Sequence, residues 1–229
     1  MKQFYSLPGR VTKRLVAASL HGWRVELDQP PQGAAVLLVH HQNLSGPIHA
    51  MALLPFHVRL WALHVFSDRK SCFDQYYGYT FTRRFGWPRP LAFCAAGLLS
   101  LAVPGFLRWF QVIPVYRGSL KLKDTFRLSG QALAQGQPVL ICPDRDYSSR
   151  DAQVGQLYEG FLQLDQPYFR ATGQRLPFYP VYCSAAGRVL LVGRPVLVEG
   201  AGKEARHQAA AKLEAAMNDL GARYGDVSP

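Results

Sequence analysis

Apolar and polar residues alternate along this chain in a pattern that predicts strands separated by helices. Trp23, Val25 and Leu27 alternate with polar residues, as in a half-exposed strand, whereas residues 34–39 (AAVLLV) form a continuous apolar run typical of a strand buried on both faces. Further strands are predicted at residues 59–66, 111–116, 138–142, 177–183 and 188–198. The order predicts an α/β fold: a single domain with a mostly parallel central sheet flanked by helices.

Two of the intervening helices are marked by their ends and by their apolar periodicity. One is predicted at about residues 120–135, with Ser119 as its N-cap and Gly136 just beyond its C-terminal end. The other spans about residues 203–223. Its apolar residues recur at helical spacing and form one stripe: Leu213, Met217, Leu220 and Tyr224.

The longest uncharged run extends from Pro90 to Leu107. It approaches the roughly 18 to 20 residues that a membrane-spanning helix needs. Pro104 argues against a span, because its ring interrupts the helical hydrogen bonds near the end of the run. We therefore predict a helix buried in the core of the domain, with a helix that dips into a membrane as the alternative.

Composition and charge add the expectation of an anionic partner. The 229 residues are 48% hydrophobic, which is enough for one core and excludes a disordered chain. The 26 Lys and Arg residues outnumber the 15 Asp and Glu residues, giving a net charge of +11. Nucleic acid, an anionic membrane and a phosphorylated substrate all fit this charge. Nucleic acid is disfavoured because the basic residues are scattered and no RNA-binding signature is present.

The first 20 residues differ from the rest, and we treat residues 21–224 as the folded domain. Arg10, Lys13 and Arg14 interleave with apolar residues at helical spacing, and no acid occurs before Glu26. This pattern predicts a basic amphipathic segment in contact with a membrane surface. A solvated basic helix packed on the domain fits the pattern equally well.

No metal or cofactor site is predicted. The four cysteines lie far apart without a C-x-x-C pair, so we expect reduced thiols in a cytosolic protein: Cys72, Cys94, Cys142 and Cys183. His49, His57 and His64 recur at intervals of eight and seven residues, which is not the spacing of a zinc site.

The loop after the first buried strand, residues 40–47 (HHQNLSGP), carries two adjacent histidines, His40 and His41. Ligands of parallel sheets bind beyond the carboxyl ends of the strands. A histidine near its unperturbed pKa of about 6.5 can take a proton from a hydroxyl group at neutral pH. The alternative is a histidine that only hydrogen-bonds the loop backbone.

Two further loops follow predicted strands and carry charged residues. Arg117 precedes Gly118 and the predicted N-cap, where arginine and helix N-terminal amides would both face a phosphate. Residues 142–150 (CPDRDYSSR) gather charges that include Asp144, Arg145 and Asp146. A surface arginine and a solvated turn are the alternatives for these two loops.

Together the loops resemble the motifs of the glycerolipid acyltransferase family, which includes lysophosphatidic acid acyltransferases. The family's N-H-x-x-x-x-D resembles HHQNLSG with His41 in the histidine place, and its second motif resembles VIPVYRG with Arg117. Its F-P-E-G resembles CPDR with Pro143 and Asp144, and its V-P-V resembles FYPVY with Pro180. The stretch YEGF at residues 158–161 is also similar, and the resemblance covers about residues 23–223.

Three positions depart from the family pattern. The motif aspartate is replaced by Gly46, and counting from His40 instead gives Ser45, so neither register supplies a carboxylate. His40 stands where the family has asparagine. Asp144 and Arg145 stand where the third motif has glutamate and glycine.

The resemblance implies transfer of a fatty acyl group to the hydroxyl of a lysophospholipid such as lysophosphatidic acid. The donor would be an acyl thioester, acyl-CoA or acyl-carrier protein, without a further cofactor. His41 would be the general base, and the acceptor would be bound by Arg117, Gly118, Asp144 and Arg145. The resemblance also implies a cytoplasmic protein, peripheral on the inner face of the cell membrane.

Loss of the motif aspartate leaves open what orients His41. Asp144, Asp146 and Tyr147 on the third loop are candidates, and His40 could assist as a second imidazole. The alternative function is a catalytically impaired protein that binds phospholipid or the membrane surface with the same fold. The oligomeric state is left open.

Overall fold

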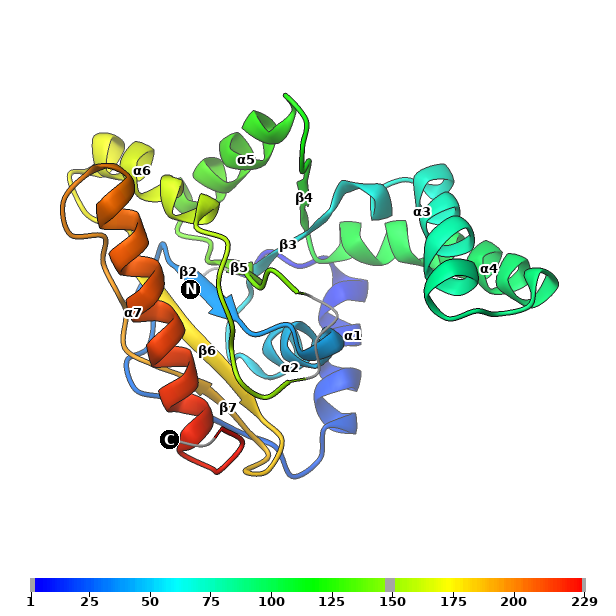
Figure 1. Ribbon diagram of the computed structural model, residues 1–229, viewed down its shortest axis with the longest axis horizontal. Coiled ribbons are helices and arrows are strands. Elements are labelled where there is room, and N and C mark those ends of the chain that lie inside the picture. Colours follow the sequence, from blue (N-terminus) through cyan, green and yellow to red (C-terminus); the bar gives the residue numbers. More distant parts are fainter. Residues whose placement is uncertain (1–2, 147–150, 228–229) are drawn as a thin grey trace.

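Seven strands form one sheet in the computed structural model, which describes residues 3–146 and 151–227 (Figure 1). The strand order is β1-β7-β6-β2-β5-β3-β4, and within these ranges every pairing except β6–β7 is parallel. The strands are β1 (Arg24–Leu27), β2 (Val36–Val39), β3 (Arg59–Leu63), β4 (Ile113–Val115), β5 (Val139–Ile141), β6 (Phe178–Ser184) and β7 (Val189–Val192). The predicted single α/β domain with a mostly parallel sheet is confirmed.

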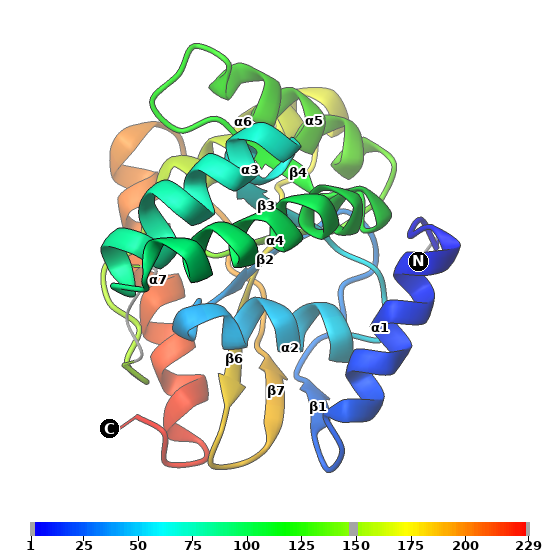
Figure 2. The same ribbon diagram turned by 90° about the vertical axis from the view of Figure 1, so that its right-hand side faces the viewer.

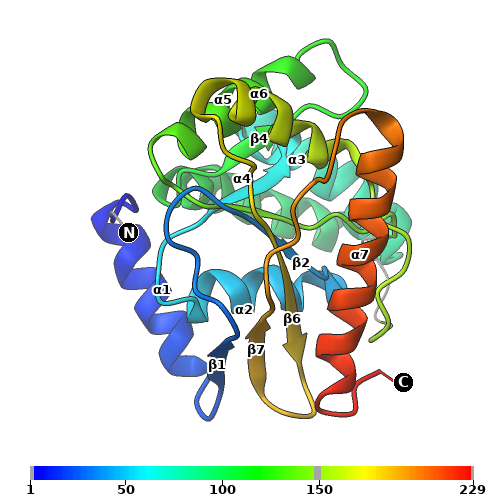
Figure 3. The same cartoon turned by 90° about the vertical axis from the view of Figure 1, so that its left-hand side faces the viewer.

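Helices cover both faces of the sheet (Figure 3). They are α1 (Leu7–Ser19), α2 (Ser45–Leu53), α3 (Arg69–Gln75), α4 (Arg89–Trp109), α5 (Leu122–Ala134), α6 (Asp165–Thr172) and α7 (Gly202–Ala222). Short helical turns are η1 (Gln42–Leu44), η2 (His64–Phe66) and η4 (Gly160–Leu164), and η3 (Tyr76–Arg84) is π-helical.

The continuous apolar run in β2 is explained by its two faces. Val36 and Leu38 point into the larger core, which α5 and α7 cover. Leu37 and Val39 point into the second core, where Ala50 of α2 packs against them. Because side chains alternate along a strand, a run without polar interruptions requires burial on both sides, and β2 has it.

Two details of the predicted elements need correction. Residues 195–198, predicted as part of the last strand, contribute only an isolated bridge between Val196 and Phe178. Ser119 is not the N-cap of α5, because the helix begins only at Leu122. The carbonyl of Ser119 instead accepts a hydrogen bond from the Leu122 amide at 2.9 Å, within the turn that precedes the helix.

Residues 69–109 form a helical arm, α3-η3-α4, that projects from the sheet (Figure 1). The prediction of a buried core helix here is wrong, since only 22% of the most apolar window of α4 is buried. The helix also runs through Pro104, which faces inward, and ends five residues later. The inward face consists of small residues while the bulky ones face outward, a division by size that average hydrophobicity does not reveal.

The N-terminal segment is fastened to the domain by polar contacts. Lys13 Nζ donates to the carbonyls of Met51 and Leu54, both at 2.7 Å, at the C-terminal end of α2. Burial lowers the pKa of Lys13 to about 8. Lys13 therefore caps the C-terminal end of α2. Of the three basic residues predicted to contact a membrane, Lys13 is engaged inside the protein.

Acid is expected to loosen this N-terminal contact through His57. The His57 Nδ1 atom accepts hydrogen bonds from the amides of Phe4 (3.0 Å) and Tyr5 (3.1 Å), so the buried ring must be neutral. Burial, together with the charges of Lys13 and Arg10, lowers its pKa to about 4. Stability from this group is present above the unfolded pKa of about 6.5 and is lost as pH falls towards 4.

Urea unfolding at pH 7 and pH 4.5 measures this loss, which we expect to be on the order of 2 kcal/mol. His57→Asn retains an acceptor near the Nδ1 position but cannot be protonated, so its loss between the two pH values should be smaller by that amount. The exposed His21→Asn is the control. Equal losses in the wild type and in His57→Asn would contradict the assignment.

Candidate functional site

The loops that follow β2, β4 and β5 lie at one edge of the sheet, where the carboxyl ends of these parallel strands meet. β2 and β5 are direct neighbours, with Val36 opposite Val139. The residue directly after β2 is His40, and the third residue after β5 is Asp144. Strand pairing therefore brings the first and third predicted loops together.

His40 and Asp144 form a buried pair in which the His40 Nδ1 atom contacts the Asp144 Oδ1 atom. The other ring nitrogen, Nε2, donates to the main-chain carbonyl of Asp151 at 2.8 Å. His40 is 3% exposed and Asp144 is 5% exposed. Burial alone lowers the pKa of His40, but the Asp144 carboxylate and the Asp151 carbonyl outweigh it, and the net shift is upward. With an acceptor at each nitrogen, the ring is held as an imidazolium.

His41 is held differently, through its main chain. Its amide donates to the Asp144 Oδ2 atom at 3.0 Å. Its half-buried ring accepts a hydrogen bond at Nδ1 from the Leu44 amide at 3.2 Å. The neutral His41 ring consequently carries its proton on Nε2. Asp144, one of the three candidates to orient His41, thus positions the backbone of His41, and the ring in contact with the Asp144 carboxylate is that of His40.

The chain between the two histidines and α2 is strained. Gln42, Asn43 and Leu44 have φ values of 45°, 51° and 81°, a left-handed run that non-glycine residues rarely adopt. This run lets the chain reverse within three residues, so that α2 starts at Ser45 beside the end of β2. Strain of this kind collects at functional sites.

Gly46 occupies the position of the motif aspartate, and the fold leaves no room there for a side chain. A Cβ atom at Gly46 would lie 1.8 Å from the His40 carbonyl oxygen and 3.1 Å from the Val39 Cγ2 atom. The first contact is with backbone, which cannot rotate away. The reversed loop therefore requires glycine, and a carboxylate at position 46 is incompatible with this path of the chain.

Two arginines share one aromatic ring beside this pair. The Cζ atoms of Arg117 and Arg145 lie 5.1 Å and 5.8 Å from the centroid of the Tyr158 ring. The Tyr158 amide donates to the Pro143 carbonyl at 2.8 Å, and Leu157 forms a bridge with Asp144. Both arginines and Tyr158 are exposed. The second and third loops thus present two cations to solvent at one place.

The remaining predicted site residues are less directly placed. Gly118 lies in the turn before α5 with a φ of 67°, so its amide does not belong to the first turn of the helix as predicted. Asp146 is exposed and follows Arg145. Tyr147 lies outside the described residues. The site therefore centres on two histidines, one carboxylate and two arginines.

Sequence reasoning missed Asp151 and Tyr158. The main-chain carbonyl of Asp151 accepts from His40 and the charge of Asp151 also raises the pKa of His40, but no motif pointed to this position. Tyr158 had a signal, because YEGF is similar to the family's stretch between its third and fourth motifs, but that similarity does not indicate an aromatic platform for both arginines. The Tyr158 ring links the loop of Arg117 to the loop of Arg145.

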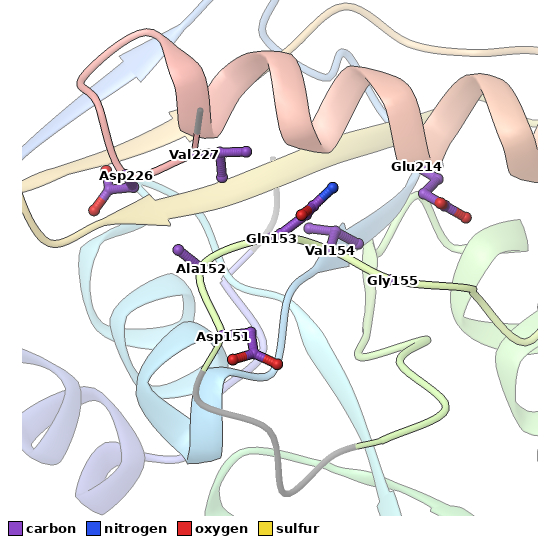
Figure 4. A pocket seen from close by; sticks show the side chains of 8 residues that line it. All are labelled: Asp151, Ala152, Gln153, Val154, Gly155, Glu214, Asp226 and Val227. Carbon is purple, nitrogen blue, oxygen red and sulfur yellow. The ribbon is translucent and has the colours of Figure 1, made fainter. Parts of the chain in front are cut away.

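A shallow hollow of about 570 Å³ lies beside the segment of residues 151–155 (Figure 4). Its lining includes the carboxylates of Asp151, Glu214 on α7 and Asp226. Three acidic groups repel an anion, whereas Arg117 and Arg145 attract one. We therefore assign the anion-binding part of the site to the arginine loops and not to this hollow.

A cluster of metal ligands or a reactive cysteine would be a further source of chemistry among the described residues. Within residues 3–146 and 151–227, no group of three or more His, Cys, Asp or Glu is placed to hold a metal ion. The four cysteines are free thiols. Burial raises the pKa of Cys72 to about 11 and that of Cys183 to about 12, and it also raises the pKa of Cys142. These three thiols stay protonated at neutral pH and are poor nucleophiles.

Comparison with protein-family models, with curated proteins and with solved structures finds no match for this chain.

Proposed function

We propose that the protein transfers a fatty acyl group from an acyl thioester to the free hydroxyl of a phosphate-bearing lysolipid, such as lysophosphatidic acid. The finer assignment to the glycerolipid acyltransferase fold is part of this proposal. So is a place on the cytoplasmic face of the cell membrane, where both substrates are found. Acyl-CoA or acyl-carrier protein serves as the donor, and no further cofactor takes part.

One observation carries the proposal. The single carboxylate of Asp144 binds the ring of His40 and the main chain of His41. The first and third segments of the acyltransferase resemblance therefore meet at the same edge of the sheet. Arg117, from the second segment, lies beside Arg145 through the shared Tyr158 ring. A phosphate held by the two guanidinium groups places the rest of an acceptor near the histidine loop.

In the proposed reaction the acceptor hydroxyl oxygen attacks the thioester carbonyl carbon, and the hydroxyl proton passes to His41. The tetrahedral intermediate then expels the thiolate, which takes up that proton from His41 and leaves as thiol, and an ester remains on the acceptor. Arg117 and Arg145 bind the acceptor phosphate. His40 is enclosed and bonded at both nitrogens, so it acts by positioning the loop through Asp144.

The hydrogen bond from the Leu44 amide limits this chemistry. The Nδ1 lone pair of His41 is occupied and the neutral ring carries its proton on Nε2, so His41 can accept a proton only after this 3.2 Å bond opens. We therefore expect slow turnover compared with a histidine whose accepting nitrogen is not already hydrogen-bonded to the main chain.

The proposal is tested by incubating purified protein with lysophosphatidic acid and either acyl-CoA or acyl-carrier protein, and measuring phosphatidic acid by mass spectrometry. His41→Ala is expected to lower turnover at least about 100-fold, the lower range for loss of a general base. His21→Ala, an exposed histidine outside the site, is the matched control. Equal turnover in His41→Ala and wild type would remove His41 from the mechanism.

A second function, binding of an anionic lipid headgroup without acyl transfer, is favoured by Gly46 and by the Leu44–His41 bond. Gly46 leaves no room for a carboxylate at position 46, and the Leu44 amide occupies the Nδ1 atom of His41. The same assay separates the two functions. Absence of product from the wild type, together with saturable binding of lysophosphatidic acid that Arg117→Ala and Arg145→Ala weaken, would establish binding alone.

A further inference from the structure

The helical arm exposes an unusual surface on α4. Four small or ring-constrained residues at intervals of four face inward and are buried: Ala92, Ala96, Ser100 and Pro104. The bulky apolar residues face outward, with Leu91 55%, Leu98 70% and Leu101 58% exposed. A helix in a water-facing domain buries its large apolar residues, so α4 is inverted with respect to water.

The outward residues form one continuous stripe along the helix. Leu91, Leu98, Leu101 and Trp109 fall on one side at the helical angle of 100° per residue, with the exposed Cys94 among them. No charged residue occurs from position 90 to position 107. The stripe is therefore apolar from end to end, over a helix of 21 residues.

Both ends of the stripe carry an aromatic residue and a cation. Trp87 and Arg89 stand at the N-terminal end, and Arg108 and Trp109 stand at the C-terminal end. Tryptophan and arginine at the two ends of an apolar segment are typical of the boundary between lipid tails and headgroups. A protein partner would place no such requirement on both ends of the helix.

Charge in the arm selects an anionic surface. Residues 69–109 contain six basic residues, Arg69, Lys70, Arg83, Arg84, Arg89 and Arg108, and one acid, Asp74. Arg83 and Arg84 are exposed in the last turn of η3, before the chain enters α4. Cations beside an exposed apolar stripe complement the phosphates of acidic lipids.

The connections of the arm exclude a membrane span. Among the described residues, α4 is the one helix long and apolar enough to cross a bilayer, with a mean hydropathy of 1.9 over its best window. At its C-terminal end, however, the Val112 amide bonds to the Leu107 carbonyl at 3.1 Å and the chain enters β4 directly. A spanning α4 would also carry its packing partner α3, with its charged residues, into the hydrocarbon.

We propose that the outer stripe of α4 lies in the interface of an anionic bilayer, with the helix axis parallel to the membrane plane. Leu91, Leu98 and Leu101 enter the acyl region, while the terminal arginines contact lipid phosphates. The arm extends away from the sheet on the side of the molecule opposite α7 (Figure 1), and α3 and α4 face the viewer in Figure 2. This inference concerns attachment and does not depend on acyl transfer, since vesicle binding is measured without substrate.

The test is binding of the full chain to vesicles, by cosedimentation and by tryptophan emission. Vesicles of phosphatidylcholine with phosphatidylglycerol should bind at least about tenfold more tightly than phosphatidylcholine alone, because each interfacial arginine contributes about 1 kcal/mol. Trp87 and Trp109, which are 37% and 40% exposed, should shift to shorter emission wavelength on binding. Absence of vesicle binding would overturn the proposal.

Variants locate the contact. Leu98→Gln combined with Leu101→Gln should weaken binding at least about tenfold, because two partly buried leucyl side chains are lost from the lipid. Leu197→Gln, at a 43% exposed leucine in the segment before α7, should bind within about twofold of wild type. Circular dichroism of the variants confirms that each is folded.

Two outcomes would contradict the proposal, one by placing the membrane contact on another helix and one by showing that the stripe is a dimer interface. Loss of binding in Leu15→Gln on α1, where Leu15 is 67% exposed, but not in the α4 pair, would place the membrane contact on α1. A dimer in light scattering that the α4 pair converts to monomer, without vesicle binding, would show that a second copy covers the stripe. Either result overturns the proposal that the α4 stripe binds lipid.

Discussion

Gly46→Asp is expected to destabilise the protein by at least about 3 kcal/mol and to give no gain in acyl transfer, although it adds the carboxylate that the acyltransferase motif has at this position. The reason is steric and begins at Cβ. That atom would lie 1.8 Å from the His40 carbonyl oxygen, so either the end of β2 or the start of α2 must move. Thermal and urea unfolding, with the acyl-transfer assay in parallel, measure both effects.

Gly46→Ala separates the steric effect from the charge. It adds only the Cβ atom, and we expect most of the destabilisation to appear already in this variant. Gly130→Ala in α5 is the matched control, because nothing lies within 4 Å of its added Cβ, and a helical glycine replaced by alanine gains about 0.5 to 1 kcal/mol. A Gly46→Ala protein with unchanged stability would contradict the account, and a more active Gly46→Asp would show that the loop can reopen.

The positions of the strands along the chain could be predicted because buried strands have an apolar pattern that few other elements share. β2 and β6 are buried along their whole length, and their runs contain no charged residue. Residues 195–198 have the same apolar character without continuing the last strand. Sequence pattern alone does not distinguish a strand paired in the sheet from an apolar loop that covers the core.

The burial of α4 could not be predicted from its hydrophobicity. A core helix and an exposed apolar helix have the same average hydropathy, and they differ in which side chains face inward. The signal lay in the size of the residues, because Ala92, Ala96 and Ser100 recur every fourth position and let α4 pack closely on α3. The leucines were then left for the outer face.

The positions of the two histidines show the limit of motif reasoning at the site. The loop after β2 and its meeting with Asp144 follow from the pairing of β2 with β5. Which ring faces the carboxylate depends on side-chain direction at the strand end and on the left-handed run from Gln42 to Leu44. A left-handed run is recognised in a sequence by its glycines, and residues 42–44 contain none. The resemblance to the family motif therefore pointed to His41 as the oriented ring.

Asp144→Ala is expected to be the most damaging change at the site, because one carboxylate serves both histidines. Its removal leaves His40 Nδ1 and the His41 amide without their acceptor in the interior. Breaking a buried pair in this way costs about 3 to 5 kcal/mol. Displacement of the His41 loop by about 1 Å should lower acyl transfer about 100-fold. Urea unfolding and the acyl-transfer assay measure the two losses.

A surface carboxylate provides the control. The Oδ1 atom of Asp124 lies 3.5 Å from the Nε atom of Arg127, and both side chains are partly exposed. Asp124→Ala should therefore change the free energy of unfolding by less than about 0.5 kcal/mol. A comparable effect in Asp124→Ala and Asp144→Ala would show that the buried pair has no special role. Activity retained in Asp144→Ala would show that His41 does not depend on this anchor.

The pH dependence of stability distinguishes a charged His40 from a neutral one. The folded pKa of His40 is raised, so its stabilising effect is complete below the unfolded pKa of about 6.5 and is lost as pH rises through the folded pKa. Asp144→Asn keeps an acceptor for the His41 amide and offers a donor to a neutral His40, but it removes the charge. We therefore expect Asp144→Asn to lose less stability than Asp144→Ala. In Asp144→Asn the pair of residues 40 and 144 should cause no decline in the free energy of unfolding above a pH of about 6.5. A wild type and an Asp144→Asn variant with parallel pH profiles would show that His40 is neutral, and that Asp144 serves the loop only as a hydrogen-bond acceptor.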